Sequence, residues 1–213
     1  RYLADDNVVF AYHEYENGRL CGAYEPFLDI VRDMLDRNSI DIEEFMKECD
    51  VYELHRSLLK GYFEEGTCYR REGVLLNEVG YEQTRLCRAI ADMLHKLSEK
   101  TPILIVLNRF QISSRSTMEL IWRLINEPSS NIGIVLGVNE KRPQNDILNS
   151  VWEEIYEYLE DHSHIYHIGS SGKEHDTWNN DILIETRDYD KILEKIKYMY
   201  EFLDYEQAKL YLQ

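Results

Sequence analysis

The alternation of apolar runs with amphipathic segments in the second half of the chain constrains the fold more than any other feature. Residues 103–107, 132–138 and 165–168 form three short, mainly apolar runs, and each is typical of a β-strand. Between them, residues 116–128 and 147–159 place apolar side chains at the three- and four-residue spacing of a helix. Strands that alternate with single helices pair in parallel within one sheet. The sequence therefore predicts an α/β fold with a doubly wound parallel sheet, in which helices cover both faces of the strand at 103–107.

The first half of the chain predicts one further strand and several helices. Residues 7–14 are rich in β-branched and aromatic side chains and predict a strand, whereas 24–35 and 81–100 predict amphipathic helices. The region from about 40 to 80 contains two more helical patterns and a glycine-containing stretch, with a possible short strand at 74–76. We therefore expect inserted helices within one α/β domain.

Two polar residues mark expected helix starts. Asp41 precedes the first helical pattern of the insertion, and Ser116 precedes the apolar positions of the helix that follows the strand at 103–107. The side-chain oxygens of Asp and Ser accept hydrogen bonds from the free N–H groups of a first helical turn. Ser116 is therefore predicted to cap its helix, and Asp41 is predicted to open one.

The end of the chain differs in pattern from the part before it. Residues 189–212 have dense helical periodicity, and the stretch DYEQAKLYL at 204–212 resembles the start of a helical repeat such as a tetratricopeptide. We expect residues 1–168 to form the α/β domain, and residues 169–213 to form a loop and a C-terminal helical segment.

The charge balance excludes some classes of partner. The chain has 213 residues, with 24 Lys and Arg against 40 Asp and Glu, which gives a formal net charge of −16. No stripe of basic residues reverses this sign locally, so broad binding to nucleic acid or to an anionic membrane is disfavoured. No apolar run approaches the roughly 20 residues of a membrane-spanning helix.

Cysteine and histidine spacing does not predict a metal site. The four cysteines form no CxxC pair, which is typical of reduced thiols in a cytoplasmic protein. The N-terminal residues also lack the features of a signal peptide, so we expect a cytoplasmic location. His162, His164 and His167 lie close in sequence, but His164 and His167 would fall on opposite faces of a strand.

Polar residues follow two of the predicted strands. Asn108 and Arg109 come directly after the strand at 103–107, and Asn139 follows the strand at 132–138. Ligands of open parallel sheets bind beyond the carboxyl ends of the strands, so these residues are candidate binding residues.

Around these residues the sequence resembles a known family. IVLNRFQISSRSTMELIWRLI resembles the Walker B region of P-loop ATPases of the AAA+ and STAND kind, and GIVLGVNEKRP resembles the sensor strand that follows it. VVFAYHEYENGRLCGAYEPFLDIVRDML resembles the STAND segment just after the P-loop helix. The resemblance covers roughly residues 7–168 and implies a P-loop NTPase-like core.

The sequence departs from this family at the residues that carry the chemistry. Asn108 and Arg109 stand where the family has acids that hold Mg²⁺ and polarise the attacking water. An amide supplies no anionic charge, and an Arg adds positive charge where the metal would sit. The phosphate-binding motif GxxxxGK[ST] is absent, and in its nearest imitation, GSSGKE at 169–174, the Lys is followed by Glu. The resemblance therefore implies ATP and Mg²⁺ binding only with a P-loop upstream of Arg1.

The leading hypothesis is a regulatory or signalling ATPase-like domain, part of a larger protein, with poor or no hydrolysis. If nucleotide binds, Asn108 and Arg109 are expected to line the γ-phosphate side, and Asn139 to act as the sensor. We predict no catalytic residue and no metal ligand, and expect partners to be proteins or other domains of the same polypeptide. One alternative is a non-catalytic interaction scaffold with an acidic, tyrosine-rich surface; another is an unrelated α/β enzyme whose catalytic acids lie among the surface ones.

Overall fold

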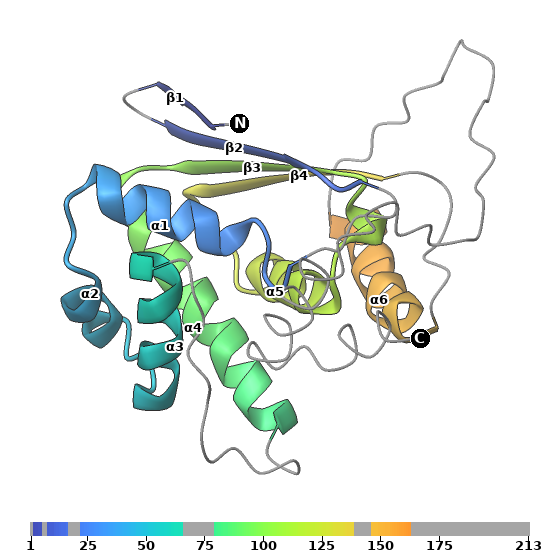
Figure 1. The fold of residues 1–213 in the computed structure, drawn as a ribbon. Helices are drawn as coiled ribbons and strands as arrows, with labels where there is room; N and C mark the ends of the chain where they lie inside the picture. The colour runs from blue at the N-terminus through green and yellow to red at the C-terminus, as the bar shows by residue number, and fades with distance from the viewer. Residues whose placement is uncertain (1, 6–7, 17–21, 66–78, 139–145, 163–213) are drawn as a thin grey trace, which may run out of the picture.

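The computed structural model of this protein describes residues 2–5, 8–16, 22–65, 79–138 and 146–162 (Figure 1). Within these ranges the chain forms one sheet with helices packed beneath it. The predicted strands at 74–76 and 165–168 and the predicted helical tail lie outside the described residues.

The sheet has the order β1-β2-β3-β4. β2 (Val8–Glu14), β3 (Ile103–Asn108) and β4 (Ile132–Gly137) are parallel, and β1 (Tyr2–Asp5) pairs antiparallel with β2 at the edge. The parallel part confirms the predicted α/β class. β1 was not expected from the sequence.

The strands bury one side of the sheet more deeply than the other. In β3, Ile103, Ile105 and Leu107 are buried, whereas the alternate residues Leu104 and Val106 are half-buried. Successive side chains of a strand point to opposite faces, so the buried set marks the face that packs against the helices. That face forms the core of the described part of the molecule.

Four helices lie on this same face (Figure 1). They are α1 (Phe27–Arg37), α4 (Val79–Lys100), α5 (Arg115–Asn126) and α6 (Asp146–His162). No helix of the described residues covers the opposite face, which we call the outer face. The expectation of helices on both faces is therefore wrong for the described part of the chain. The strand residues of the outer face are apolar, but they are only partly buried.

The helices α2 (Ile42–Glu48) and α3 (Glu53–Glu65) fall in the region predicted as an insertion. Asp41, which was predicted to open this helix, is the N-cap of α2, and its side chain accepts a hydrogen bond of 2.9 Å from the backbone N–H of Glu44. α3 is held against α4 by the buried side chains of His55 and Glu82, whose Nε2 and Oε2 atoms lie 3.0 Å apart.

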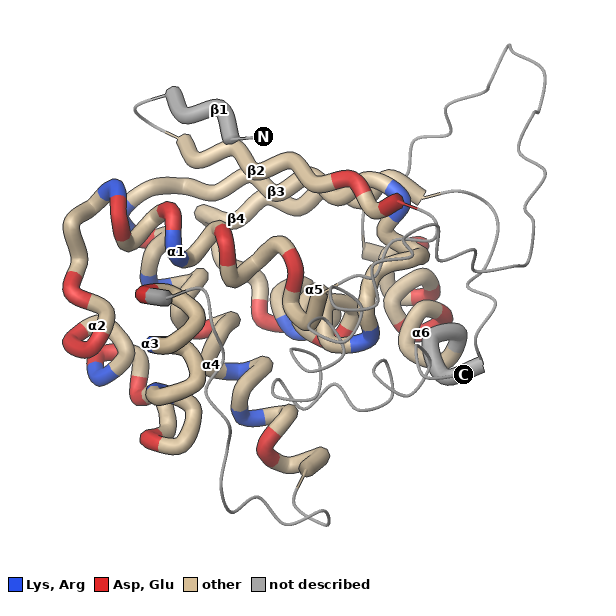
Figure 2. The backbone as a smooth tube through the Cα atoms, viewed as in Figure 1, with Lys and Arg blue, Asp and Glu red and all other residues tan. Residues whose placement is uncertain are grey.

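Charged residues lie mainly in the helices rather than in the strands (Figure 2). β2 carries no charged residue before Glu14, and β3 and β4 carry none. The described parallel strands are thus apolar except at the edge where they end. None of the described helices is both long enough and apolar enough to cross a lipid bilayer.

Candidate functional site

The candidate site lies at the edge of the sheet where the parallel strands end. The register pairs Glu14 of β2 with Asn108 of β3, and Asn108 with Gly137 of β4. Because Leu107 is buried on the helix side, Asn108 is directed to the outer face. The same alternation along β2 directs Glu14 to that face, so the two polar side chains lie on neighbouring strands.

The side chain of Asn108 is held by the turn that follows it. Its Oδ1 atom accepts a hydrogen bond of 3.0 Å from the backbone N–H of Arg109. This bond uses the amide oxygen and directs the Nδ2 donors away from it. A Cβ atom on Gly137 would lie 2.7 Å from the same Oδ1 atom, so only glycine fits beside Asn108 in this arrangement.

Arg109 has a left-handed backbone conformation, with φ of 56° and ψ of 39°. It begins the short 3₁₀ turn Phe110–Ile112, and its side chain turns back over β2. The Arg109 Nε atom lies 3.6 Å from Glu14 Oε1, while Glu14 Oε2 accepts a hydrogen bond of 3.0 Å from the Tyr12 hydroxyl. Arg109 and Glu14 are 39% and 43% exposed, so the pair is open to solvent and to a ligand.

Behind this edge the chain buries polar groups. Gln111 and Ser113 are both 1% exposed. Neither the amide atoms of Gln111 nor the hydroxyl of Ser113 has a hydrogen-bond partner in the described part of the structure. The intervening turn is anchored by Phe110, whose ring lies 5.9 Å from that of Trp152 in α6.

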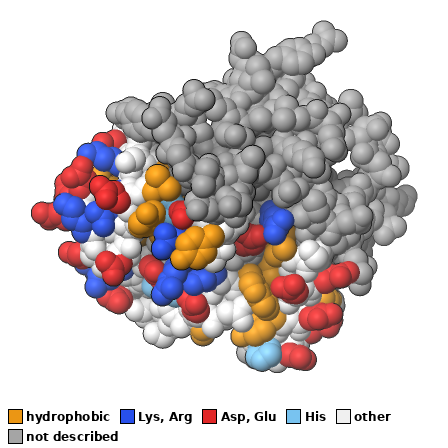
Figure 3. All heavy atoms as spheres, turned by 90° about the horizontal axis from the view of Figure 1, so that it is seen from below, with side chains coloured by type: hydrophobic (Ala, Val, Ile, Leu, Met, Phe, Trp, Pro, Cys, Tyr) orange, Lys and Arg blue, Asp and Glu red, His pale blue; other side chains and the backbone are white. Residues whose placement is uncertain are grey.

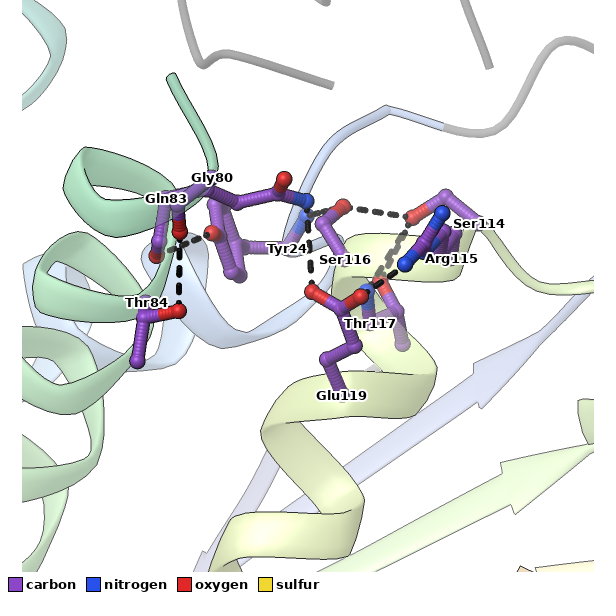
Figure 4. Close-up of polar contacts among 9 residues, drawn as sticks. All are labelled: Tyr24, Gly80, Gln83, Thr84, Ser114, Arg115, Ser116, Thr117 and Glu119. Carbon is purple, nitrogen blue, oxygen red and sulfur yellow. Dashed lines mark hydrogen bonds and ion pairs between the residues drawn. The ribbon is translucent and has the colours of Figure 1, made fainter. Parts of the chain in front are cut away.

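A network of hydroxyl groups occupies the start of α5 (Figure 4). Ser114, and not Ser116 as predicted, is the N-cap, because its Oγ atom accepts a hydrogen bond from the Thr117 backbone N–H. Ser116 lies in the first turn and accepts a hydrogen bond of 3.2 Å from the Tyr24 backbone N–H. Ser114 also donates to the carbonyl oxygen of Gly22 at 3.2 Å. These bonds fasten the segment before α1 to α5 and use the hydroxyl groups at the start of α5 internally.

The structure brings together two of the three predicted binding residues. Asn108 and Arg109 lie side by side at the strand end, whereas Asn139 lies outside the described residues. Residues 169–174 and His164 and His167 also lie outside them. His162, at the end of α6, stacks on Tyr158 with ring centroids 4.2 Å apart.

Sequence reasoning missed Glu14 as a member of this site. A signal was present, because Glu14 ends the strand predicted at residues 7–14, and the strand-end rule that selected Asn108 applies equally to it. Which strands would be neighbours, however, depends on the register and order of the sheet. No group of three His, Cys, Asp or Glu side chains that could hold a metal ion occurs among the residues that the structure describes.

Comparison of the chain with models of protein families, with curated proteins and with solved structures finds no match.

Proposed function

We propose that this chain is the part of a regulatory P-loop ATPase-like domain, of the STAND or AAA+ type, that follows the P-loop. In this proposal the domain binds ATP at the carboxyl edge of the parallel sheet and hydrolyses it slowly or not at all. The observation that carries the proposal is the pairing of the strand ends, which places Asn108, Arg109 and Glu14 at the edge where parallel sheets bind ligands.

The direction of the strand connections is compatible with an upstream unit and indicates where it would pack. The chain steps from β2 to β3 to β4, and the connecting helices lie on one face (Figure 1). An upstream strand placed beyond β4 would have to return to β2 in the opposite direction, by a connection that includes the edge strand β1. A right-handed connection in that direction places its helix on the outer face. A P-loop between that strand and that helix would lie at the same edge of the sheet as Asn108.

The outer face is apolar, as is typical of a sheet face that a helix covers. Val135 of β4 is 50% exposed and Tyr12 of β2 is 38% exposed, and Val106 of β3 lies between them, with Leu104 on the same face of β3. Contiguous apolar surface of this kind marks an interaction site in soluble proteins. Gly133, which pairs with Leu104, adds no side chain and permits close approach of another backbone.

The absence of a carboxylate at Asn108 and Arg109 supports poor hydrolysis. ATP hydrolysis requires a group that orients or deprotonates the attacking water and a group that holds Mg²⁺. Glu14 is the one carboxylate whose contact with this pair the structure records, and Arg109 and Tyr12 engage both of its oxygens. A nucleotide-dependent switch that does not depend on rapid turnover fits these residues better than an efficient ATPase.

A second candidate function is a protein-interaction scaffold without nucleotide. It is favoured by an exposed aromatic group on the helical side, where Arg85 stacks between the rings of Tyr52 and Tyr81 at 4.6 Å from each centroid. Tyr52 and Tyr81 are 51% and 62% exposed. Seen from that side, the described surface carries acidic and basic side chains beside apolar patches (Figure 3). Exposed aromatic and arginine side chains are enriched at protein interfaces.

Thermal unfolding tests the proposed function against the scaffold. The 213-residue chain and a polypeptide extended upstream of Arg1 are each heated with and without ATP and ADP, in Mg²⁺ and in EDTA. A ligand at 100 times its dissociation constant stabilises by about 2.7 kcal/mol, so binding is visible as a shift in Tm. We expect a shift in the extended polypeptide and little or none in the shorter chain. No shift under any condition would contradict nucleotide binding and favour the scaffold.

A further inference from the structure

The strand-end site presents hydrogen-bond donors where a metal site presents acceptors. The Oδ1 atom of Asn108 already accepts from the backbone N–H of Arg109, and this bond orients the side chain, whose Nδ2 group carries two further N–H donors. The Nη groups of Arg109 have no partner among the residues that the structure describes, since its contact with Glu14 is through Nε. Gly137, the neighbour of Asn108 on β4, contributes no side chain.

These residues do not fit Mg²⁺. The ion requires six oxygen ligands in near-octahedral arrangement, usually with one or two carboxylates. Here the available carboxylate is that of Glu14, and the Arg109 guanidinium lies 3.6 Å from it and would repel a divalent cation. The residues present therefore disagree with the metal that the family resemblance implies, and they indicate a different ligand.

We propose that this edge binds the terminal phosphate of a nucleotide directly, without Mg²⁺, through the Arg109 guanidinium and the Asn108 Nδ2–H group. This inference rests on the proposed function, because the rest of the nucleotide would be held by an upstream P-loop. Guanidinium groups bind phosphate oxygens in a paired geometry and keep their charge at all physiological pH values. The positive charge of Arg109 thus takes the place of the charge that a metal ion would supply.

In this proposal Glu14 is the partner of Arg109 when no phosphate is bound. The pair is solvent-exposed and its closest recorded contact is 3.6 Å, which is long for a charge-assisted hydrogen bond. Exposed pairs of this kind contribute little to stability, so a phosphate can displace the carboxylate at low cost. Glu14 therefore competes with the nucleotide, and its removal is expected to strengthen binding.

The backbone of Arg109 offers a way to separate binding from folding. A left-handed conformation is unfavourable for Arg and favourable for Gly. The substitution Arg109→Gly removes the guanidinium while relieving this conformation, so the variant is expected to be at least as stable as the parent. Loss of binding in such a variant cannot be attributed to unfolding.

The test is a titration of the extended polypeptide with ATP, followed by isothermal calorimetry, in excess EDTA and again in Mg²⁺. We expect similar affinity in both buffers. Arg109→Gly and Arg109→Gln should weaken binding about tenfold or more, which is the effect of losing a charged hydrogen-bond donor. Glu14→Gln should strengthen it. The double substitution Asn108→Asp with Arg109→Asp should make binding depend on Mg²⁺.

The results that overturn this inference differ from those that overturn the proposed function. If ATP binds only with Mg²⁺, or if Glu14→Gln weakens binding, the site holds a metal ion and direct phosphate binding is wrong, although the chain still binds nucleotide. If Arg109→Gly binds ATP as tightly as the parent, Arg109 is not at the phosphate. If ATP binds in neither buffer, both proposals are wrong.

Discussion

Gln111 is a buried amide whose polar atoms lack partners. The side chain is 1% exposed, and neither Oε1 nor Nε2 makes a hydrogen bond within the described part of the protein. An unsatisfied buried amide costs about 1 to 3 kcal/mol. We therefore expect Gln111→Met, which keeps length and flexibility, to raise the free energy of unfolding by about 1 kcal/mol or more in urea titrations. The matched variant Gln111→Glu should lower it, because it buries a charge. Destabilisation by both would show that the amide has a partner in solution.

Cys87 is the buried thiol of α4, and burial raises its pKa to about 12. Because the unfolded thiol loses its proton near pH 8.5, the contribution of the native thiol to stability is complete below that pH and is lost as the pH rises toward 12. The stability of the parent should therefore fall relative to that of Cys87→Ala above about pH 8.5, by up to about 1.4 kcal/mol per pH unit. Urea titrations of both proteins from about pH 7 to pH 10 measure this difference. If the free energies of unfolding of the two proteins change equally with pH, this prediction is wrong.

At the scale of elements, the N-terminus of α5 connects distant parts of the chain. Ser114 caps the helix and also donates to Gly22 in the segment before α1. Asp41 is a cap of the same kind at α2, but its bond is exposed and local. Ser114→Ala should cost about 2 kcal/mol, and Asp41→Ala about 1 kcal/mol or less, in equilibrium unfolding. Equal losses would mean that the contacts of Ser114 beyond its own helix contribute nothing.

Periodicity predicted most elements because each is long enough to repeat its pattern. Strands at 7–14, 103–107 and 132–138 are confirmed within a residue or so of their observed ends, and the helix at 81–100 is confirmed with two more residues at its start. β1 escaped prediction because four residues at a sheet edge show no repeat. Ser116 was predicted as the cap, but Ser114, two positions earlier, offers the same hydroxyl chemistry to the first turn and caps the helix.

Sequence reasoning could identify only those site residues that directly follow a single predicted strand. Asn108 and Arg109 were identified because a polar pair directly follows an apolar run. The contact of Arg109 with Glu14 depends on which strand lies beside β3 and in which register, and residues 95 positions apart carry no such information. The hydrogen bond that orients the Asn108 amide likewise depends on a turn geometry, the left-handed conformation of Arg109.

At the scale of the whole molecule, the described part is a sheet with one covered and one open face. All four helices that pack on the sheet lie beneath it (Figure 1). An apolar strand predicts that both of its faces meet protein, but it does not say whether the protein comes from the same stretch of chain. This is why the expectation of two helical layers failed for the described residues.

The open face yields a prediction that separates the 213-residue chain from a longer polypeptide. Val135 lies on the outer face of β4 and is 50% exposed, whereas Ile105 of β3 is fully buried on the helix side. In the 213-residue chain Val135→Lys should change the free energy of unfolding by no more than about 0.5 kcal/mol, as at other surface positions. In the extended polypeptide it should cost about 3 kcal/mol or more, because a helix on the outer face would bury the charge.

Ile105→Lys is the control, since it should unfold both proteins. Urea titrations of the four variants, followed by circular dichroism, give the comparison. A large loss from Val135→Lys in the shorter chain itself would mean that residues of this chain outside the described ranges cover the outer face. The upstream helix would then have no open surface to occupy, and the place that the proposed function gives to the P-loop would be wrong.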